Sequence, residues 1–342
     1  MYKKIGKVNI ELTDKCNSRC PQCHRTDSKN NCRPHKWIQN IEWTFEDFKR
    51  AFPDPHCYPD FYFCGTFGDP LMCNDLYEIV KDIMENSNSQ IFISTNASVR
   101  NEDWWFIFSQ WGNRVQINFA IDGLEDTNHL YRVGTNFKKI MLNAQAFIDG
   151  KGHANWTFIV FKHNQHQVEE AKRLSIEMGF KSFEIIKSER WNKDLDEDHH
   201  TYNYKGKQYR LDPPTNEYKN EKTDLWHVKD DKEKIIDCYA IKEKEVWIDC
   251  RGYVTPCCFF QNKLYLFMAG VVDNFNISTE LKLPKKTFLG GFDELNIFKH
   301  TLEKINKSHF LNNYIMGHVW KNKLNPCYNV CGKGIQKEIV VL

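Results

Sequence analysis

The feature that most constrains the fold is an alternation of short apolar runs with helical patterns between residues 7 and 187. Short apolar runs bounded by turn signals are typical of buried parallel strands, and the helical stretches between them provide the crossover connections. The strand candidates lie at residues 7–12, 61–64, 90–94, 115–121, 156–161 and 183–186. Six such units predict an α/β fold, a partial (β/α)6 TIM-like barrel that is open rather than closed.

Helix boundaries between these runs carry recognisable signals. Thr44 followed by Asp47 is a capping pattern for a helix over 44–52, and Asn74-Asp75 precedes a helix over 76–86. A third helix, over 165–178, is predicted to end at Gly179 because glycine readily adopts a left-handed backbone. These predicted helices support the prediction of repeated βα units.

The remainder of the chain changes character twice. Residues 188–235 are crowded with charged and polar side chains, which predicts a charged linker or insertion after a barrel over 1–187. Residues 236–342 hold six further cysteines and a hairpin pattern around Gly252. We therefore expect a smaller, cysteine-rich C-terminal domain.

Charge and hydropathy exclude several classes of function. Because 47 basic residues nearly balance 45 acidic ones, no global field favours nucleic acid or an anionic membrane. No stretch has the ~20 apolar residues of a membrane span, and the N-terminus lacks a signal-peptide core, so we expect a cytoplasmic protein. An odd count of thirteen cysteines suits a disulfide framework poorly and favours metal ligation.

Three cysteines, Cys16, Cys20 and Cys23, directly follow the first predicted strand. Barrel folds place their chemistry at the carboxyl ends of strands. Three thiolates can hold three irons of a [4Fe-4S] cluster and leave the fourth iron open, whereas electron-transfer clusters normally use four. The alternative is a structural zinc site completed by His24 or Cys32.

The C-x3-C-x2-C pattern after a first strand resembles the hallmark of the radical S-adenosylmethionine (SAM) superfamily. This resemblance implies a partial barrel, a SAM-binding [4Fe-4S] cluster and S-adenosylmethionine itself. It also implies reductive cleavage of SAM to a 5'-deoxyadenosyl radical that abstracts hydrogen from a substrate.

Further segments at predicted strand ends resemble family motifs. The segment from Gly65 to Pro70 is similar to the family's Gly-Gly-Glu-Pro, with Asp69 in place of glutamate, and Arg132 is implied to pair with the cofactor carboxylate. Taken singly, each segment also fits an ordinary turn or strand end. The resemblance implies these cofactor-binding residues: Gly68, Asp69, Pro70, Ser94, Asn96, Asp122 and Arg132.

The C-terminal cysteines resemble those of SPASM and twitch auxiliary domains. The resemblance implies one auxiliary [4Fe-4S] cluster, with Cys250 and Cys258 as neighbours or substitutes for its ligands. A four-cysteine zinc site is the alternative. The implied ligands are Cys238, Cys257, Cys327 and Cys331.

Together these patterns predict a radical SAM enzyme, an oxidoreductase or maturase, that oxidises or otherwise modifies a peptide or small molecule. An external one-electron reductant of the flavodoxin or ferredoxin type is implied as a partner. No general acid or base is identified. The alternative function is a non-catalytic iron-sulfur or zinc-binding electron-transfer protein, which would not need the strand-end segments.

Overall fold

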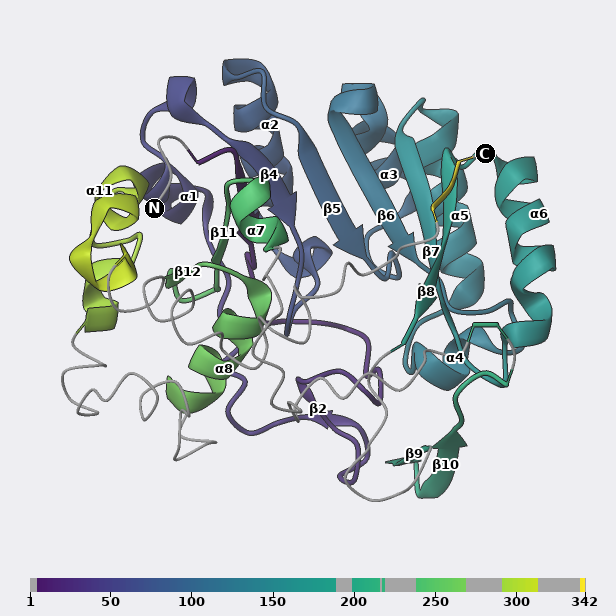
Figure 1. Ribbon diagram of the computed structural model, residues 1–342. Helices are drawn as coiled ribbons and strands as arrows, with labels where there is room; N and C mark the ends of the chain where they lie inside the picture. The colour runs from purple at the N-terminus through teal and green to yellow at the C-terminus, as the bar shows by residue number, and fades with distance from the viewer. Residues whose placement is uncertain are drawn as a thin grey trace.

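The structure is a computed structural model that describes residues 5–188, 199–215, 217–218, 238–268, 291–312 and 339–341. The described residues form a nine-stranded, mostly parallel sheet in the order β12-β11-β1-β4-β5-β6-β7-β8-β13 (Figure 1). Six consecutive members pair in parallel and confirm the predicted partial barrel. They are β1 Lys7–Ile10, β4 Asp60–Phe63, β5 Ile91–Thr95, β6 Val115–Ala120, β7 His153–Val160 and β8 Ser182–Lys187.

Strands from the C-terminal part extend both edges of this sheet. β11 (Glu245–Ile248) pairs in parallel with β1, and β12 (Val254–Thr255) pairs with β11 as the predicted hairpin. Gly252 takes φ +86° in the hairpin turn, a conformation that favours glycine. At the other edge, β13 (Ile339–Val341) runs antiparallel to β8. Part of the segment predicted as a separate C-terminal domain therefore shares the sheet of the barrel.

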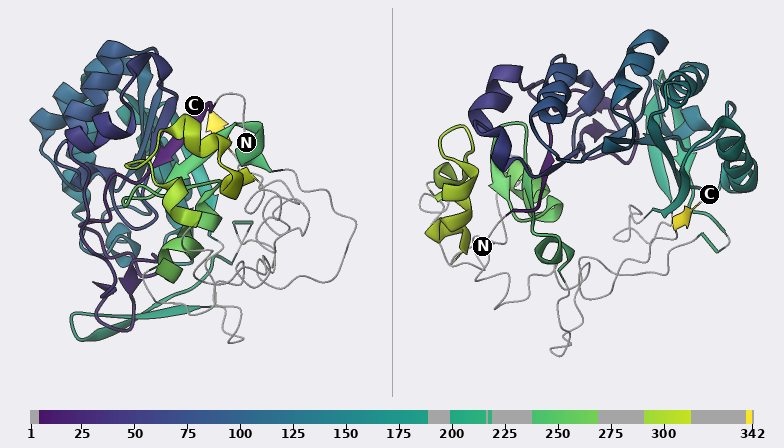
Figure 2. Two further views of the ribbon diagram at one scale, coloured as in Figure 1. Left: turned by 90° about the vertical axis from the view of Figure 1, so that its left-hand side faces the viewer. Right: turned by 90° about the horizontal axis from the view of Figure 1, so that it is seen from above.

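Helices cover one side of the curved sheet, as Figure 2 shows from above. The predicted capping box at Thr44 and the left-handed Gly179 are both present. Asp75, by contrast, makes no side-chain cap of its own helix, because its carboxylate accepts from the backbone N of Phe45 at 2.8 Å. The covering helices are α1 Phe45–Ala51, α2 Leu76–Asn86, α3 Glu102–Phe108, α5 Phe137–Asp149 and α6 Val168–Met178.

The two faces of the sheet differ in polarity. Val8, Phe61 and Ile93 are fully buried in one core with helix residues such as Ile79 and Ile83. Because side chains alternate along a strand, the intervening residues lie on the opposite face. Those positions are largely polar, so the short runs predicted as apolar strands are apolar mainly on the face that packs against the helices. The residues that we call the polar face are Tyr62, Ser94, Asn118, Asn155 and Ser182.

Part of the predicted charged linker is ordered against the barrel. β9 (His200–Tyr204) and β10 (Lys207–Leu211) form a hairpin. Its Tyr202 hydroxyl donates to the Leu130 carbonyl at 2.7 Å, and Tyr202 packs in an apolar cluster that includes Cys20. Within the predicted linker, the structure describes residues 188, 199–215 and 217–218, and the remaining residues lie outside the described part.

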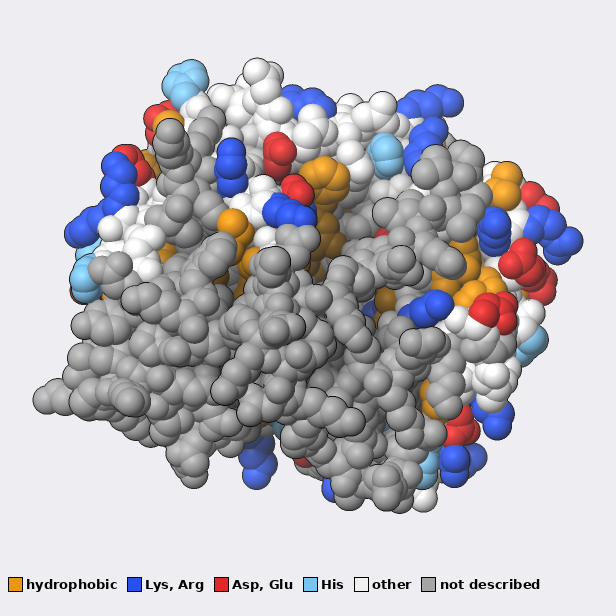
Figure 3. Space-filling model, in the orientation of Figure 1, with side chains coloured by type: hydrophobic (Ala, Val, Ile, Leu, Met, Phe, Trp, Pro, Cys, Tyr) orange, Lys and Arg blue, Asp and Glu red, His pale blue; other side chains and the backbone are white. Residues whose placement is uncertain are grey.

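Smaller elements complete the described chain. No helix among the described residues is long and apolar enough to cross a membrane. Positive and negative side chains are interspersed around the rim in Figure 3, in keeping with the balanced composition. The smaller elements are β2 Thr26–Asp27, β3 Arg33–Pro34, α4 Asn128–Tyr131, α7 Tyr239–Lys242, α8 Cys258–Met268 and α11 Leu302–Lys307.

Candidate cofactor and metal site

The predicted cluster cysteines lie in the loop that follows β1. Cys20 is buried, and Cys16 and Cys23 are half-buried. The backbone fixes the loop, since the N–H of Arg19 donates to the Val133 carbonyl at 2.8 Å and the N–H of Cys23 to the Cys20 carbonyl at 3.0 Å. The three thiols are therefore presented by a loop tied to other parts of the barrel.

Each thiol contacts a different strand-end segment. Asn96, after β5, places Nδ2 3.7 Å from Cys16 Sγ, and Arg132, after α4, places Nη1 3.7 Å from Cys20 Sγ. The Sγ of Cys23 lies 4.0 Å from the carbonyl of Thr66, in the turn after β4. Parallel strands bring their carboxyl ends to one edge, which is why these segments converge.

The environment of the thiols bears on the type of centre. Burial raises the pKa of the Cys16 thiol above its ordinary value, and the nearby Asp69, Cys20 and Cys23 add to this effect. Among the described residues, no three His, Cys, Asp or Glu side chains are grouped to hold a single metal ion, Cys16, Cys20 and Cys23 included, so this grouping favours neither zinc nor an iron-sulfur cluster. Three thiols spread over one loop fit the donor set of a [4Fe-4S] cluster with one open iron.

The glycines of the turn after β4 are explained by close approach within the protein. A Cβ added to Gly68 would lie 1.8 Å from the Thr13 carbonyl oxygen, and one added to Gly65 would lie 1.7 Å from the Gly68 carbonyl oxygen. The N–H of Asp69 also donates to the Lys15 carbonyl at 2.8 Å. This turn is thus pressed against the segment that leads into the cysteine loop.

Asp69 organises the residues around it with its side chain. Asp69 is 4% exposed, and its carboxylate accepts hydrogen bonds from Leu71 N, Thr95 Oγ1, Asn96 N and Asn96 Nδ2. Burial raises the pKa of Asp69, and these hydrogen bonds oppose the rise. Pro70, buried, follows at the start of a 3-10 turn, Pro70–Met72.

Ser94 is placed differently from Asn96. Its Oγ lies 2.7 Å from the hydroxyl of Tyr62, so the side chain belongs to the polar face of the sheet. Asn96 Nδ2 also donates to Asn17 Oδ1 at 2.9 Å, within the cysteine loop. Of these two residues, Asn96 is hydrogen-bonded to that loop and Ser94 to Tyr62.

Asp122 and Arg132 form a buried ion pair. The Nε of Arg132 donates to Asp122 Oδ2 at 2.5 Å, and Asp122 Oδ1 accepts from the backbone N of Ile159 at 2.7 Å. Although burial opposes the charge, the Asp122 carboxylate raises the pKa of Arg132 above its ordinary value. Asp122 is fully buried, and its carboxylate oxygens accept hydrogen bonds from Arg132 and Ile159. Arg132, in turn, places a terminal nitrogen next to Cys20.

Residues 10–174, which contain this whole arrangement, match the profile of the Radical SAM superfamily. The chain contains a radical SAM domain. No curated protein sequence matches the chain.

Solved structures of low sequence identity share the fold of the radical SAM domain and its surroundings. The structure of anSMEcpe with bound AdoMet aligns with a TM-score of 0.53 at 16% identity, over 95% of this chain and 84% of that one. Streptococcus suis SuiB aligns with a TM-score of 0.57 at 14% identity, over 97% and 73% of the two chains. SuiB bound to the precursor peptide SuiA gives 0.56 and 13%, over 92% and 67%. At these identities the likeness establishes the fold.

The second set of cysteines is only partly described. Cys238 immediately precedes α7, Cys257 immediately precedes α8, and Cys258 opens that helix with Sγ 3.7 Å from the Tyr239 hydroxyl. Cys250 is buried, and its carbonyl accepts from Trp43 Nε1 at 2.9 Å. Cys327 and Cys331 lie outside the described residues, so the auxiliary ligand set stays a prediction.

Sequence reasoning overlooked two groups of polar side chains on the sheet. The first is Glu11, 2% exposed, whose Oε1 accepts from the backbone N–H groups of Phe67 at 2.5 Å and Gly68 at 2.9 Å. The second is the polar face, where Asn155 links Asn118 at 3.2 Å to Ser182 at 2.9 Å. Alternation of polar and apolar residues within the strand runs was the signal for both.

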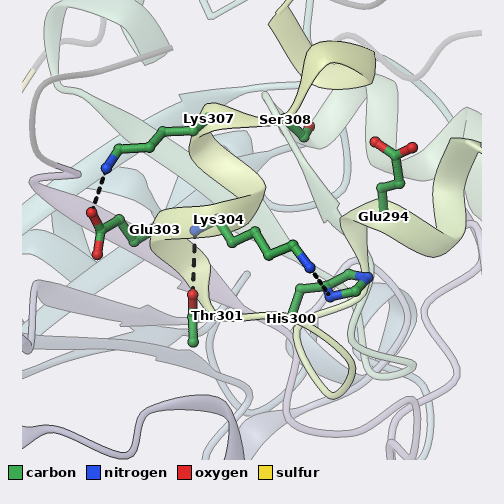
Figure 4. Close-up of a pocket in the computed structure, with 7 residues that line it drawn as sticks. All are labelled: Glu294, His300, Thr301, Glu303, Lys304, Lys307 and Ser308. Atoms are coloured by element: carbon green, nitrogen blue, oxygen red, sulfur yellow. Dashed lines mark hydrogen bonds and ion pairs between the residues drawn. The ribbon is translucent and has the colours of Figure 1, made fainter.

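A pocket of about 620 Å³ opens elsewhere, around α11 (Figure 4). Lys304 Nζ lies 3.2 Å from His300 Nδ1, and Lys307 pairs with Glu303 at 2.5 Å. Its lining comes only from residues 294–308, well separated in sequence from the strand ends. This pocket is a charged hollow on the surface, and none of its lining residues belongs to the cysteine loop.

Proposed function

We propose that this chain is a radical SAM enzyme that cleaves S-adenosylmethionine reductively and abstracts hydrogen from a substrate with the resulting 5'-deoxyadenosyl radical. The observation that carries the proposal is the contact of Cys16, Cys20 and Cys23 with three different strand-end segments. A protein that only bound a metal would need the three thiols and not the neighbouring strand-end segments. When bound, a [4Fe-4S] cluster supplies the electron for this cleavage.

The protein's own residues have the task of holding the reactants. The three thiols would hold the cluster, while Asn96 and Arg132 lie next to the thiols, where they would meet the methionine end of SAM. Asp122 would orient Arg132 through the 2.5 Å bond to Nε, so that the guanidinium, whose Nη1 contacts Cys20 Sγ, would meet a carboxylate of the cofactor. Burial of Cys20 excludes water from one side of the site.

The polar face is the proposed surface for the substrate. The Tyr62 hydroxyl meets Ser94 at 2.7 Å, and burial raises the pKa of Tyr62 to about 12, so this group is a neutral hydrogen-bonding partner at physiological pH. Amide and hydroxyl groups suit the main chain of a peptide or a hydroxylated small molecule. The peptide-bound state of SuiB supports the peptide class.

We extend the proposal to an auxiliary [4Fe-4S] cluster held by Cys238, Cys257, Cys327 and Cys331. Such a cluster supplies an electron acceptor for a two-electron oxidation of the substrate, which would make the enzyme an oxidoreductase or maturase. A flavodoxin or ferredoxin in the cytoplasm would provide the initiating electron.

The test is SAM cleavage by anaerobically purified protein reconstituted with iron and sulfide and reduced with dithionite. Chromatography follows 5'-deoxyadenosine for the parent, a Cys16/Cys20/Cys23 triple alanine variant and a Cys57→Ala control, which loses an exposed thiol. We expect product from the parent and control only, with about four irons retained by the triple variant. Zinc in place of iron, or no cleavage by fully loaded parent, would favour the non-catalytic metal-binding protein instead.

A further inference from the structure

Glu11 is a buried carboxyl group at the carboxyl end of β1. The residue is 2% exposed, and its N–H donates to the Ile248 carbonyl of β11 at 2.9 Å. Strand alternation places Asn9 and Glu11 on the side opposite the apolar core residues Val8 and Ile10. Its side chain therefore lies between the barrel sheet and the turn that follows β4.

One oxygen of Glu11 holds two successive N–H groups of that turn. Oε1 accepts from Phe67 N at 2.5 Å and from Gly68 N at 2.9 Å, whereas the buried Oε2 has no hydrogen-bond partner among the described residues. Buried backbone N–H groups need acceptors, and a turn without them would rearrange. Glu11 is the side chain that satisfies both.

The opposite side of the turn is fixed by the segment leading to the cysteines. Gly68 packs so closely on Thr13 that a Cβ would lie 1.8 Å from its carbonyl oxygen, and Asp69 N donates to the Lys15 carbonyl at 2.8 Å. Thr66, in the same turn, approaches Cys23 Sγ at 4.0 Å. The turn is held between Glu11 and the segment of Thr13 and Lys15, and it adjoins a cluster cysteine.

We propose that Glu11 is a positioning residue for SAM binding, holding the turn at residues 65–68 in the conformation that receives the methionine end of the cofactor. This inference rests on the proposed function. Glu11 touches the turn, and it acts on SAM only through the turn's backbone. Loss of the Glu11 Oε1 acceptor should therefore weaken SAM binding in protein that is still folded and loaded with iron.

The experiment measures the dissociation constant of SAM by anaerobic equilibrium dialysis on reconstituted protein, together with iron content and thermal unfolding. The variants are Glu11→Ala, Glu11→Gln, Glu11→Asp and a control, Asn9→Ala, which changes a neighbouring side chain of the same face that is also 2% exposed. Glutamine keeps an oxygen at the Oε1 position. Aspartate retains the carboxyl group and withdraws its oxygens from the turn by one methylene.

We expect Glu11→Ala and Glu11→Asp to bind SAM about tenfold more weakly, because both variants lose the two hydrogen bonds that hold the turn. Glu11→Gln and Asn9→Ala should stay close to the parent. Parental affinity in folded, iron-loaded Glu11→Ala would overturn the inference. If that variant does not fold, Glu11→Gln binding more weakly than Glu11→Asp would overturn it. A loaded parent that binds no SAM would refute the proposed function itself.

Discussion

Asp69 and Asn96 are joined by two hydrogen bonds to a single oxygen. Oδ2 of Asp69 accepts from the backbone N of Asn96 at 2.9 Å and from its Nδ2 at 2.7 Å. The same Nδ2 lies 3.7 Å from Cys16 Sγ. The turn after β4 thus sets the position of a β5 side chain against a proposed cluster ligand.

We expect Asp69→Ala to lower the free energy of unfolding by about 2–4 kcal/mol, because it leaves Leu71 N, Thr95 Oγ1 and Asn96 N without their buried acceptor. Denaturant unfolding of the purified protein measures the change. Asp75→Ala is the matched control, since the side-chain carboxylate of Asp75 accepts one hydrogen bond, from Phe45 N, among the described residues, and its loss should cost about 1 kcal/mol. Equal losses for the two variants would contradict this role of Asp69.

The Asp122–Arg132 pair is expected to show strong coupling. Removing one partner of a buried ion pair costs about 3–5 kcal/mol because the other charge is left uncompensated. A double-mutant cycle with Asp122→Ala and Arg132→Ala should therefore give a loss for the double variant well below the sum of the single losses. Arg210 and Asp212 pair at 2.7 Å in a more exposed position and should couple by less than about 1 kcal/mol. Additive losses at Asp122 and Arg132 would argue against the pair.

Stability is expected to depend on pH through Glu11. Burial raises its pKa in the folded protein from 4.5 to about 8, although the N–H groups of Phe67 and Gly68 lower it. The folded state then keeps a proton that the unfolded state releases, so this contribution is complete below pH 4.5 and is lost as pH rises toward 8. Relative to Glu11→Gln, the parent should lose about 1.4 kcal/mol per pH unit across that window and none above it. Parallel stability curves for the two proteins would refute the raised pKa.

Gly68→Ala should displace the turn after β4. The added Cβ would meet the Thr13 carbonyl oxygen at 1.8 Å, a backbone contact that no side-chain rotation relieves. We expect a loss of at least about 2 kcal/mol in unfolding free energy, as in overpacked interiors. Gly112→Ala is the control, because its Cβ would meet nothing within 4 Å and only its φ of +53° is strained, for about 1 kcal/mol. A milder effect at Gly68 than at Gly112 would contradict the close packing.

The auxiliary centre is tested by separate alanine variants of Cys257 and Cys258 after iron reconstitution. If Cys257 is a ligand and Cys258 is a neighbour held near Tyr239, Cys257→Ala should lose about four irons per chain and Cys258→Ala few. Iron and sulfide analysis measures both. The reverse result would transfer the ligand role to Cys258, and no loss in either would argue against a centre that uses this pair.

The sequence by itself determined the six parallel strands, the capping of α1, the end of α6 and the loop that carries Cys16, Cys20 and Cys23. Each of these depends on residues close together in the chain, through hydrophobic periodicity, capping side chains or cysteine spacing. The polarity of the sheet's second face was also present in that local alternation, in runs such as the one holding Gln116 and Asn118.

Only the tertiary structure decided which side chains meet. Asn96 reaches Cys16 from 80 residues away, Arg132 reaches Cys20 from 112, and Glu11 holds Phe67 from 56. The pairing of β11 with β1 is of the same kind. Such contacts depend on strand order and register in the sheet, which arise from packing the whole chain, whereas periodicity in a sequence reports only the face on which each residue lies.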